Sequence, residues 1–173
     1  MTEADTLPRV LVASASKHGS TTQIADQVAE RLRTAGLEVD ARGVAEVRDV
    51  EPYGAVVLGS AVYAGRWRRE AVRFLGRHRR ALAERPVWLF QSGPLSEEPE
   101  PEHMGPPKKV RAMAEEIGAR EHVTFGGNLD PGRTDFPASA MVRRGLGKDF
   151  RNPTQIRAWA DGIAQALGGA PGS

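Results

Sequence analysis

The chain has 173 residues, which is enough for one domain with a buried core. Its 24 Lys and Arg residues nearly balance its 22 Asp and Glu residues, so composition gives no reason to expect a nucleic-acid partner. The absence of cysteine excludes disulfides, thiolate chemistry and most zinc or iron–sulfur sites. No apolar run approaches the ~18 residues of a membrane helix, and the acidic start lacks a signal-peptide pattern. We therefore expect a cytoplasmic protein.

Short aliphatic strands alternate with amphipathic helical patterns from the start of the chain. The first expected strand is 9–15, and a helix follows it, with apolar residues at helical spacing over 24–35 and Gly36 as its stop. A second strand is expected at 37–43. The continuous apolar run at 53–60 predicts a third strand that is buried on both faces.

The same alternation continues through the second half of the chain. A helical stripe is expected over 67–82, followed by a fourth strand at 86–92. A Pro- and Glu-rich loop leads to a helix marked by apolar residues at 110–117, and a fifth strand is expected at 122–127. The closing helix is expected over 152–167, because an asparagine can cap it and a proline fits its first turn.

Five strands alternating with helices predict an α/β fold with a parallel sheet and helices on both faces. We expect one domain over 8–168, with 1–7 and 169–173 as flexible tails. Ligands of such sheets bind beyond the carboxyl ends of the strands, so the loops after strands one, three and four matter most. The connection over 128–152 is unusually long, and long connections are often functional.

A hydroxyl-rich corner, SASKHGSTTQ at 14–23, joins the first strand to the first helix. A helix N-terminus with several hydroxyls and a glycine is a natural site for an anion. The chain has neither a triphosphate-binding loop nor a dinucleotide fingerprint, which favours a phosphate monoester. The alternative is that Ser20 or Thr21 only caps the helix.

Three segments resemble the flavodoxin family, and within it the branch that includes the menaquinone-dependent protoporphyrinogen oxidases. They are SASKHGSTTQIA at 14–25, YGAVVLGSAVYAGRW at 53–67 and TQIRAWADGIAQAL at 154–167. The resemblance covers about 9–167. It implies a flavodoxin-like three-layer sandwich, in which a five-stranded parallel sheet has the order 2-1-3-4-5, and it implies FMN as the cofactor.

The resemblance also assigns residues to the flavin site. The residues that match the family's phosphate loop are Ser16, Lys17, His18, Gly19, Ser20 and Thr21. Those that match the loop on one face of the flavin ring are Val62, Tyr63, Ala64 and Gly65, with the tyrosine stacking on the ring. Those that match the loop along the other edge are Gln91, Ser92, Gly93 and Pro94.

Two departures from the family pattern affect this site. The loop after strand four lacks the second aromatic residue that flavodoxins usually place there. One face of the ring is then open to a substrate or partner, or covered by Phe136 of the long connection. His18 stands where the family often has a small hydroxyl or acidic residue.

An arginine-rich segment, 66–85, carries eight arginines against Glu70 and Glu84. The first interpretation is a solvated helix face. The second is a surface that attracts anionic lipid at the inner face of the membrane, an acidic protein, or a polycarboxylate such as a porphyrinogen.

Three functions remain open at this point. The first is an FMN-dependent oxidoreductase of the protoporphyrinogen oxidase type, which passes electrons from a reduced organic substrate to a quinone. The second is a flavodoxin-type electron-transfer protein that serves redox-partner proteins. The third is a flavin-free scaffold with the same fold. No catalytic acid or base stands out in the candidate loops, and the four histidines show no metal-binding spacing.

Overall fold

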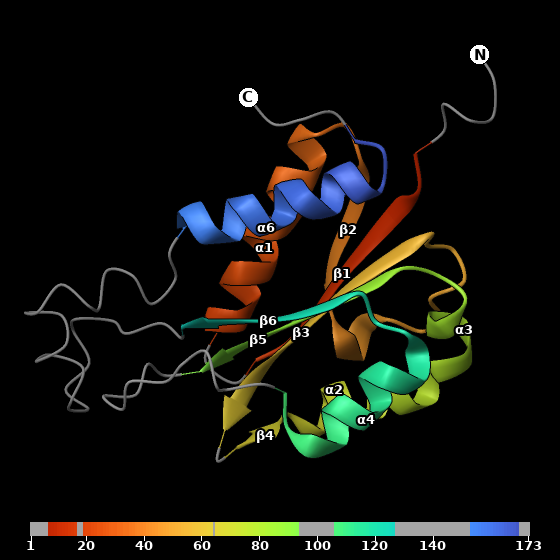
Figure 1. Cartoon of the computed structure of the whole chain (residues 1–173), viewed down its shortest axis with the longest axis vertical. Coiled ribbons are helices and arrows are strands. Elements are labelled where there is room, and N and C mark those ends of the chain that lie inside the picture. The colour runs from red at the N-terminus through yellow and green to blue at the C-terminus, as the bar shows by residue number, and fades with distance from the viewer. Residues whose placement is uncertain (1–6, 17–18, 64, 94–105, 127–152, 170–173) are drawn as a thin grey trace, which may run out of the picture.

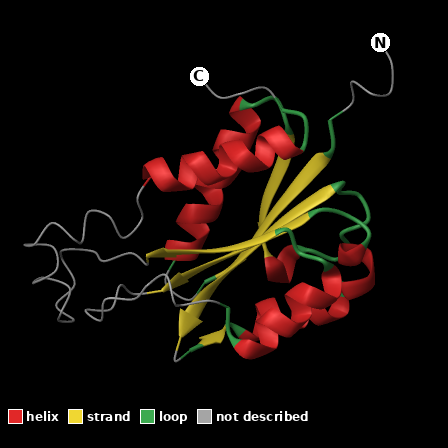
Figure 2. Ribbon diagram, in the orientation of Figure 1, coloured by secondary structure: helices red, strands yellow, loops and turns green. Residues whose placement is uncertain are grey.

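In the computed structural model, a twisted sheet is covered by helices on both faces, which gives three layers (Figures 1 and 2). The structure describes residues 7–16, 19–63, 65–93, 106–126 and 153–169. The predicted α/β class, a parallel sheet between two helical layers, is confirmed.

Five strands form the parallel sheet, and they run in the order β2-β1-β3-β5-β6. Their bounds are β1 (Arg9–Ala15), β2 (Glu38–Gly43), β3 (Ala55–Tyr63), β5 (Val87–Gly93) and β6 (Glu121–Gly126). This matches the predicted order of the parallel strands. The sheet differs from the prediction by a sixth strand, the two-residue β4 (Arg66–Trp67), which pairs antiparallel with the end of β3.

The two helical layers come from different parts of the chain, as Figure 1 shows. One face of the sheet carries the first and last helices, and the other face carries the helices between them. The helices are α1 (Ser20–Thr34), α2 (Arg69–Arg77), α3 (Arg79–Ala83), α4 (Lys108–Ile117) and α6 (Pro153–Ala166), with a short 3₁₀ turn, η2 (Val44–Glu46).

The predicted single helix over 67–82 is wrong in two respects. Its first residue, Trp67, belongs to β4, and the helix is divided into α2 and α3 at His78. The backbone of His78 has φ −104° and ψ 14°, outside regular helical values, and Gly76 lowers the helical propensity just before the break. The apolar spacing persists across both pieces because both pack against the same face of the sheet.

The core has one hydrophobic cluster on each face of the sheet. Along β1, Val10 and Val12 face α1 and α6, whereas Leu11 faces the α2–α4 side. This alternation explains why the strands read as continuous apolar runs, because both faces of the sheet are covered. Trp159 of α6 is half-buried against the rings of Phe90 and Phe125.

A two-pronged ion pair joins the first and last helices of the chain. Arg31 donates from Nε to Asp161 Oδ1 at 2.7 Å and from its terminal nitrogen to Oδ2 at 3.1 Å. The guanidinium bond lowers the pKa of the Asp161 carboxyl. This contact fixes α6 beside α1, at the end of a long connection in the sequence.

A close approach between neighbouring strands depends on glycine at position 59. Gly59 of β3 pairs with Phe90 of β5, and a Cβ added to Gly59 would lie 2.1 Å from the Phe90 Cζ atom. Phe90 is fully buried, so its ring has no room to withdraw. The buried ring therefore requires the absence of a side chain on the neighbouring strand.

We predict that Gly59→Ala destabilises the protein by about 1–3 kcal/mol, because it overpacks a filled core. Gly162→Ala is the matched control, since a Cβ there meets no atom within 4 Å and the residue lies inside α6. That change should stabilise the protein by about 0.5–1 kcal/mol through helix propensity. Urea unfolding of both variants measures the two effects, and equal stability of both variants would contradict this packing argument.

Candidate functional site

Three chain segments end at the same edge of the sheet because their strands are in register. Ala15 pairs with Ser60, and Ser60 pairs with Gln91, so the carboxyl ends of β1, β3 and β5 lie side by side at this edge. The chain leaves β1 toward β2 on one side and returns to β3 on the other, which makes this edge the switch point in strand order. Ligands of doubly wound sheets bind in this position.

The corner after β1 is built around a left-handed glycine. Gly19 has φ 87°, a value that suits glycine, and its N–H donates to Ser16 Oγ at 2.8 Å. Since Ser16 Oγ accepts this bond, its own hydroxyl hydrogen remains for another acceptor. A Cβ at Gly19 would meet no atom within 4 Å, so the space beside the helix start is open. The corner therefore offers donors to an anion.

A buried hydroxyl pair connects this corner to the end of β5. Thr21 Oγ1 and Ser92 Oγ lie 2.6 Å apart, and the two side chains are 0% and 2% exposed. Only one of the two hydroxyl hydrogens can lie in this bond, and the described residues show no acceptor for the other hydrogen. The Thr21 side chain is therefore buried in the first turn of α1 and binds the end of β5.

The segment after β3 is a tight hairpin, which sequence reasoning described only as a loop. Val62 and Tyr63 at the end of β3 pair with Trp67 and Arg66 of β4, and Gly65 has φ 75° in the connecting turn. The side chain of Ser60, which is fully buried, stabilises the segment that follows β4. Its Oγ accepts the Arg68 N–H at 3.0 Å and donates to the Ala61 carbonyl at 2.9 Å.

The hairpin is attached to the sheet through a buried side-chain network. Trp67 Nε1 donates to Gln91 Oε1 at 2.9 Å, and His122 Nε2 lies 3.1 Å from the same oxygen. Because an indole N–H can only donate, the Gln91 oxygen must face Trp67. The Gln91 amide nitrogen then donates to Thr124 Oγ1 at 3.2 Å, and His122 must carry its proton on Nε2.

Burial lowers the pKa of His122 to about 4, and the nearby charge of Arg111 acts in the same direction. Near neutral pH the imidazole is therefore neutral, and its single ring proton, on Nε2, is donated to Gln91. Its ring centroid lies 6.2 Å from that of Trp67. A neutral histidine under the hairpin completes the polar network without adding a buried charge.

The predicted site residues separate into three groups. The corner residues Ser16, Gly19 and Thr21 and the hairpin residues Val62 and Gly65 lie at the same sheet edge. The backbones of Ser20, Tyr63 and Gly93 lie there too. The structure instead places the Gln91 side chain in the interior, 1% exposed and bound to Trp67. The predictions that lie outside the described residues concern Lys17, His18, Ala64, Pro94, Phe136 and Asn152.

Sequence reasoning missed the partners of Gln91. His122 and Thr124 alternate along β6 and point to the same side of the sheet as Gln91. Polar residues at period two inside a covered strand need hydrogen-bond partners, so this pattern is the signal that would have found them.

The arginine-rich segment contains both structural and exposed cations. Arg85 is structural, because it donates to the carbonyls of Val50 and Tyr53, each at 2.7 Å. Arg68 is paired with Glu70 at 3.0 Å. Of the remaining arginines, Arg79 lies 3.8 Å from Glu116. The exposed arginines of the segment are Arg66, Arg69, Arg73, Arg77, Arg79 and Arg80.

None of the helices that the structure describes is long and apolar enough to cross a bilayer. Within the same ranges, no three His, Cys, Asp or Glu side chains are grouped so that they could hold a metal ion.

The chain is therefore an α/β protein in which a left-handed glycine at a helix start, hydroxyl groups and a hairpin lie together at the switch point, where ligands of such sheets bind. Residues 11–144 match the family model described as Flavodoxin domain. The chain belongs to this family.

Solved structures show the same fold at low sequence identity. An archaeal flavodoxin is 15% identical, with a TM-score of 0.62, and 92% of this chain covers 99% of that one. Flavodoxin 2 from Bacillus cereus is 23% identical, with a TM-score of 0.60 and coverages of 91% and 97%. Rubredoxin oxygen:oxidoreductase from Desulfovibrio gigas is 18% identical, with a TM-score of 0.63, and 92% of this chain covers 36% of it. No curated protein matches.

We predict that the unfolding free energy falls as the pH drops from about 6.5 toward about 4, in part because of His122. The unfolded chain has the ordinary pKa of 6.5 at this residue and the folded chain about 4, so only the unfolded chain binds the proton in this window. His122→Gln keeps an N–H donor for Gln91 but does not titrate. Urea midpoints across this window should fall less in the variant, and parallel curves would contradict the assignment.

Proposed function

We propose that this protein binds FMN at the edge where β1, β3 and β5 end, and that it acts as a flavodoxin-type redox protein. The observation that carries the proposal is the corner at Gly19, with its open space, a helix N-terminus and the hydroxyls of Ser16, Thr21 and Ser92 from the corner, α1 and β5. An anion is stabilised by such a helix end, and a monoester such as the phosphate of FMN needs no lysine of a triphosphate loop.

The described residues fit the parts of FMN. Ser16, Gly19 and Thr21 offer a hydroxyl, a left-handed turn and the first helical turn to a phosphoryl group. The hairpin of β3 and β4 offers backbone at Val62 and Gly65 and, at Tyr63, an aromatic residue type for one side of the flavin ring. Ser92 and Gly93 lie at the end of β5 for the other edge of the ring. When bound, FMN supplies the redox chemistry, and the protein orients it.

Electron transfer between partners is the function that this site supports best. Membership of the flavodoxin domain family supports it, and so do structural neighbours that are themselves flavodoxins. None of the described site residues forms a pair of acid and base placed for substrate chemistry. The donor and acceptor are predicted to be redox-partner proteins or a quinone.

A narrower function is an oxidase of the quinone-dependent protoporphyrinogen type. The observation that favours it is the set of exposed arginines on α2 and α3, since an anionic substrate is attracted to a cationic surface. In the family that the sequence resembles, ordinary electron carriers tend to be acidic, so this cationic surface argues against a simple carrier. The resemblance of the segments at 14–25 and 53–67 also supports it.

We predict that purified protein binds FMN and that Gly19→Ala weakens FMN binding at least tenfold. A methyl group in the open space would displace the phosphoryl group from a backbone donor, and a hydrogen bond to a charged group is worth about 1.5–3 kcal/mol. Gly118→Ala is the matched control, because Gly118 is also left-handed with no atom within 4 Å of an added Cβ, yet it lies at the end of α4. Flavin absorbance and fluorescence titrations measure both variants.

Riboflavin separates the phosphate contribution from the ring contribution. It lacks the phosphoryl group, so Gly19→Ala should leave its weaker binding nearly unchanged. Equal loss of FMN affinity in the Gly19 and Gly118 variants would contradict the assignment of the phosphate corner. A protein that stays colourless with excess FMN would favour the flavin-free scaffold.

The oxidase function predicts turnover of protoporphyrinogen with a menaquinone analogue as the electron acceptor. The rate with FMN-loaded protein should exceed the rate of the flavin-free protein, and Arg69→Gln with Arg73→Gln should lower kcat/KM by weakening attraction of the anionic substrate. FMN binding without turnover would discard the oxidase function and leave the electron-transfer function in place.

A further inference from the structure

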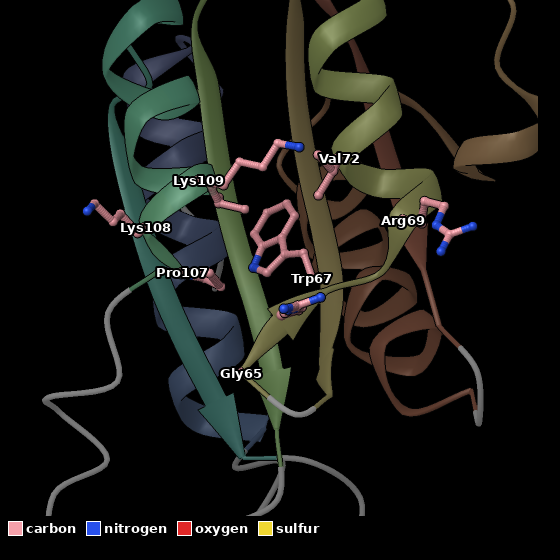
Figure 3. A pocket seen from close by; sticks show the side chains of 9 residues that line it. Gly65, Trp67, Arg69, Val72, Pro107, Lys108 and Lys109 are labelled. Carbon is pink, nitrogen blue, oxygen red and sulfur yellow. The ribbon is translucent and has the colours of Figure 1, made fainter.

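A cavity of about 650 Å³ lies between the first turns of α2 and α4, beside the β3–β4 hairpin (Figure 3). We call it the α2–α4 pocket. Its cationic lining residues are Arg66, Arg69, Lys108 and Lys109. Its apolar lining residues are Trp67, Val72, Pro107 and Val110. The volume is within the range of small-molecule sites, about 300–1,000 Å³.

Among the described residues, every charged side chain that lines the pocket is positive and none is acidic. Within the same ranges, none of the four cations forms an ion pair. The adjacent Arg68, by contrast, is held by Glu70 at 3.0 Å. The first turns of two helices, nine and ten residues long, also border the pocket with their positive ends. The pocket therefore favours an anion.

The centre of the pocket is apolar and fixed in place. The Trp67 side chain is 4% exposed, and its indole nitrogen is bound to Gln91 at 2.9 Å. Figure 3 shows the Trp67 ring between the two helices, with Lys109 reaching across toward Val72. The Arg69 and Lys108 side chains point away from the ring in the same view. Lys109 therefore reaches over the apolar centre, whereas Arg69 and Lys108 supply a positive rim.

We propose that the α2–α4 pocket binds a small conjugated carboxylate, a class of ligand distinct from the flavin. Its apolar body would pack against Val72, Pro107 and the part of Trp67 that lines the pocket, and its carboxylate would pair with Lys109 inside the positive rim. A bare inorganic anion would leave the apolar walls unused, and a neutral aromatic compound would leave the cations unpaired. Only a ligand with both parts matches the whole lining.

The pocket shares a wall with the predicted flavin site. Gly65 and Trp67 line the pocket, and they belong to the hairpin whose opposite strand ends in Val62 and Tyr63. A ligand in the pocket therefore changes the affinity for FMN, and FMN changes the affinity for the ligand by the same factor. This second consequence rests on the proposed FMN site, whereas binding to the pocket itself does not.

The test uses 2-naphthoate and its neutral isostere 2-naphthamide, titrated into the full-length protein without FMN. Calorimetry should show the carboxylate binding at least tenfold more tightly than the amide. Lys109→Gln should remove at least tenfold of the carboxylate affinity, whereas Arg73→Gln, an exposed cation on α2 outside the pocket, should change it less than twofold. In NMR spectra the indole N–H signal of Trp67 should shift, while that of Trp159 should not.

Two results would overturn the proposal. One is equal affinity for the acid and the amide, and the other is equal loss of affinity in the Lys109 and Arg73 variants. Repeating the titration with FMN present tests the coupling separately. If FMN does not bind at all, the flavin site fails while the naphthoate result stands, so the two failures are distinguishable.

Discussion

A buried hydrogen bond from the Trp67 indole to the Gln91 side chain holds the candidate site together. The strand β4 has two residues and, among the strands that the structure describes, pairs with β3 alone, so the ladder gives the hairpin little support. The donor-only indole fixes the Gln91 amide, and the amide then fixes the proton on His122 Nε2. The same hairpin forms one wall of the proposed flavin site and one wall of the α2–α4 pocket. The geometry of both sites therefore depends on this buried interaction, together with the bond from the Arg68 N–H to Ser60.

The apolar runs predicted the parallel sheet because both of its faces are covered, and 9–15 is found as β1 without change. The hairpin was not predicted, since two residues are too few for a strand pattern. Trp67 falls at helical spacing from Ala71, so its apolar character fitted a helix start as well as a strand. The inward direction of the Gln91 side chain was missed because its role was assigned from a family resemblance. Two of the hydrogen-bond partners that hold the side chain inside, His122 and Thr124, lie on β6.

The positive charges of this protein have two different uses. Arg31 and Arg85 are structural. The guanidinium of Arg31 binds Asp161, and that of Arg85 binds the carbonyls of Val50 and Tyr53. The cations at the starts of α2 and α4 have no such partners in the described part of the chain, and they surround an apolar cavity. Composition alone gave a net charge of +2, which does not distinguish these uses. The hydrogen bonds of each guanidinium distinguish structural cations from the others. The cations left to bind a ligand surround the α2–α4 pocket, and they include only part of the arginine-rich segment.

The central claim is that three turns at one edge of the sheet bind a flavin mononucleotide together. The most direct measurement follows the backbone amide signals of the glycines by NMR as FMN is added. The account predicts that the signals of Gly19, Gly65 and Gly93 shift together with one affinity, while those of Gly118 and Gly162 do not move. Shifts confined to one turn, or centred on the glycines of α4 and α6, would contradict it.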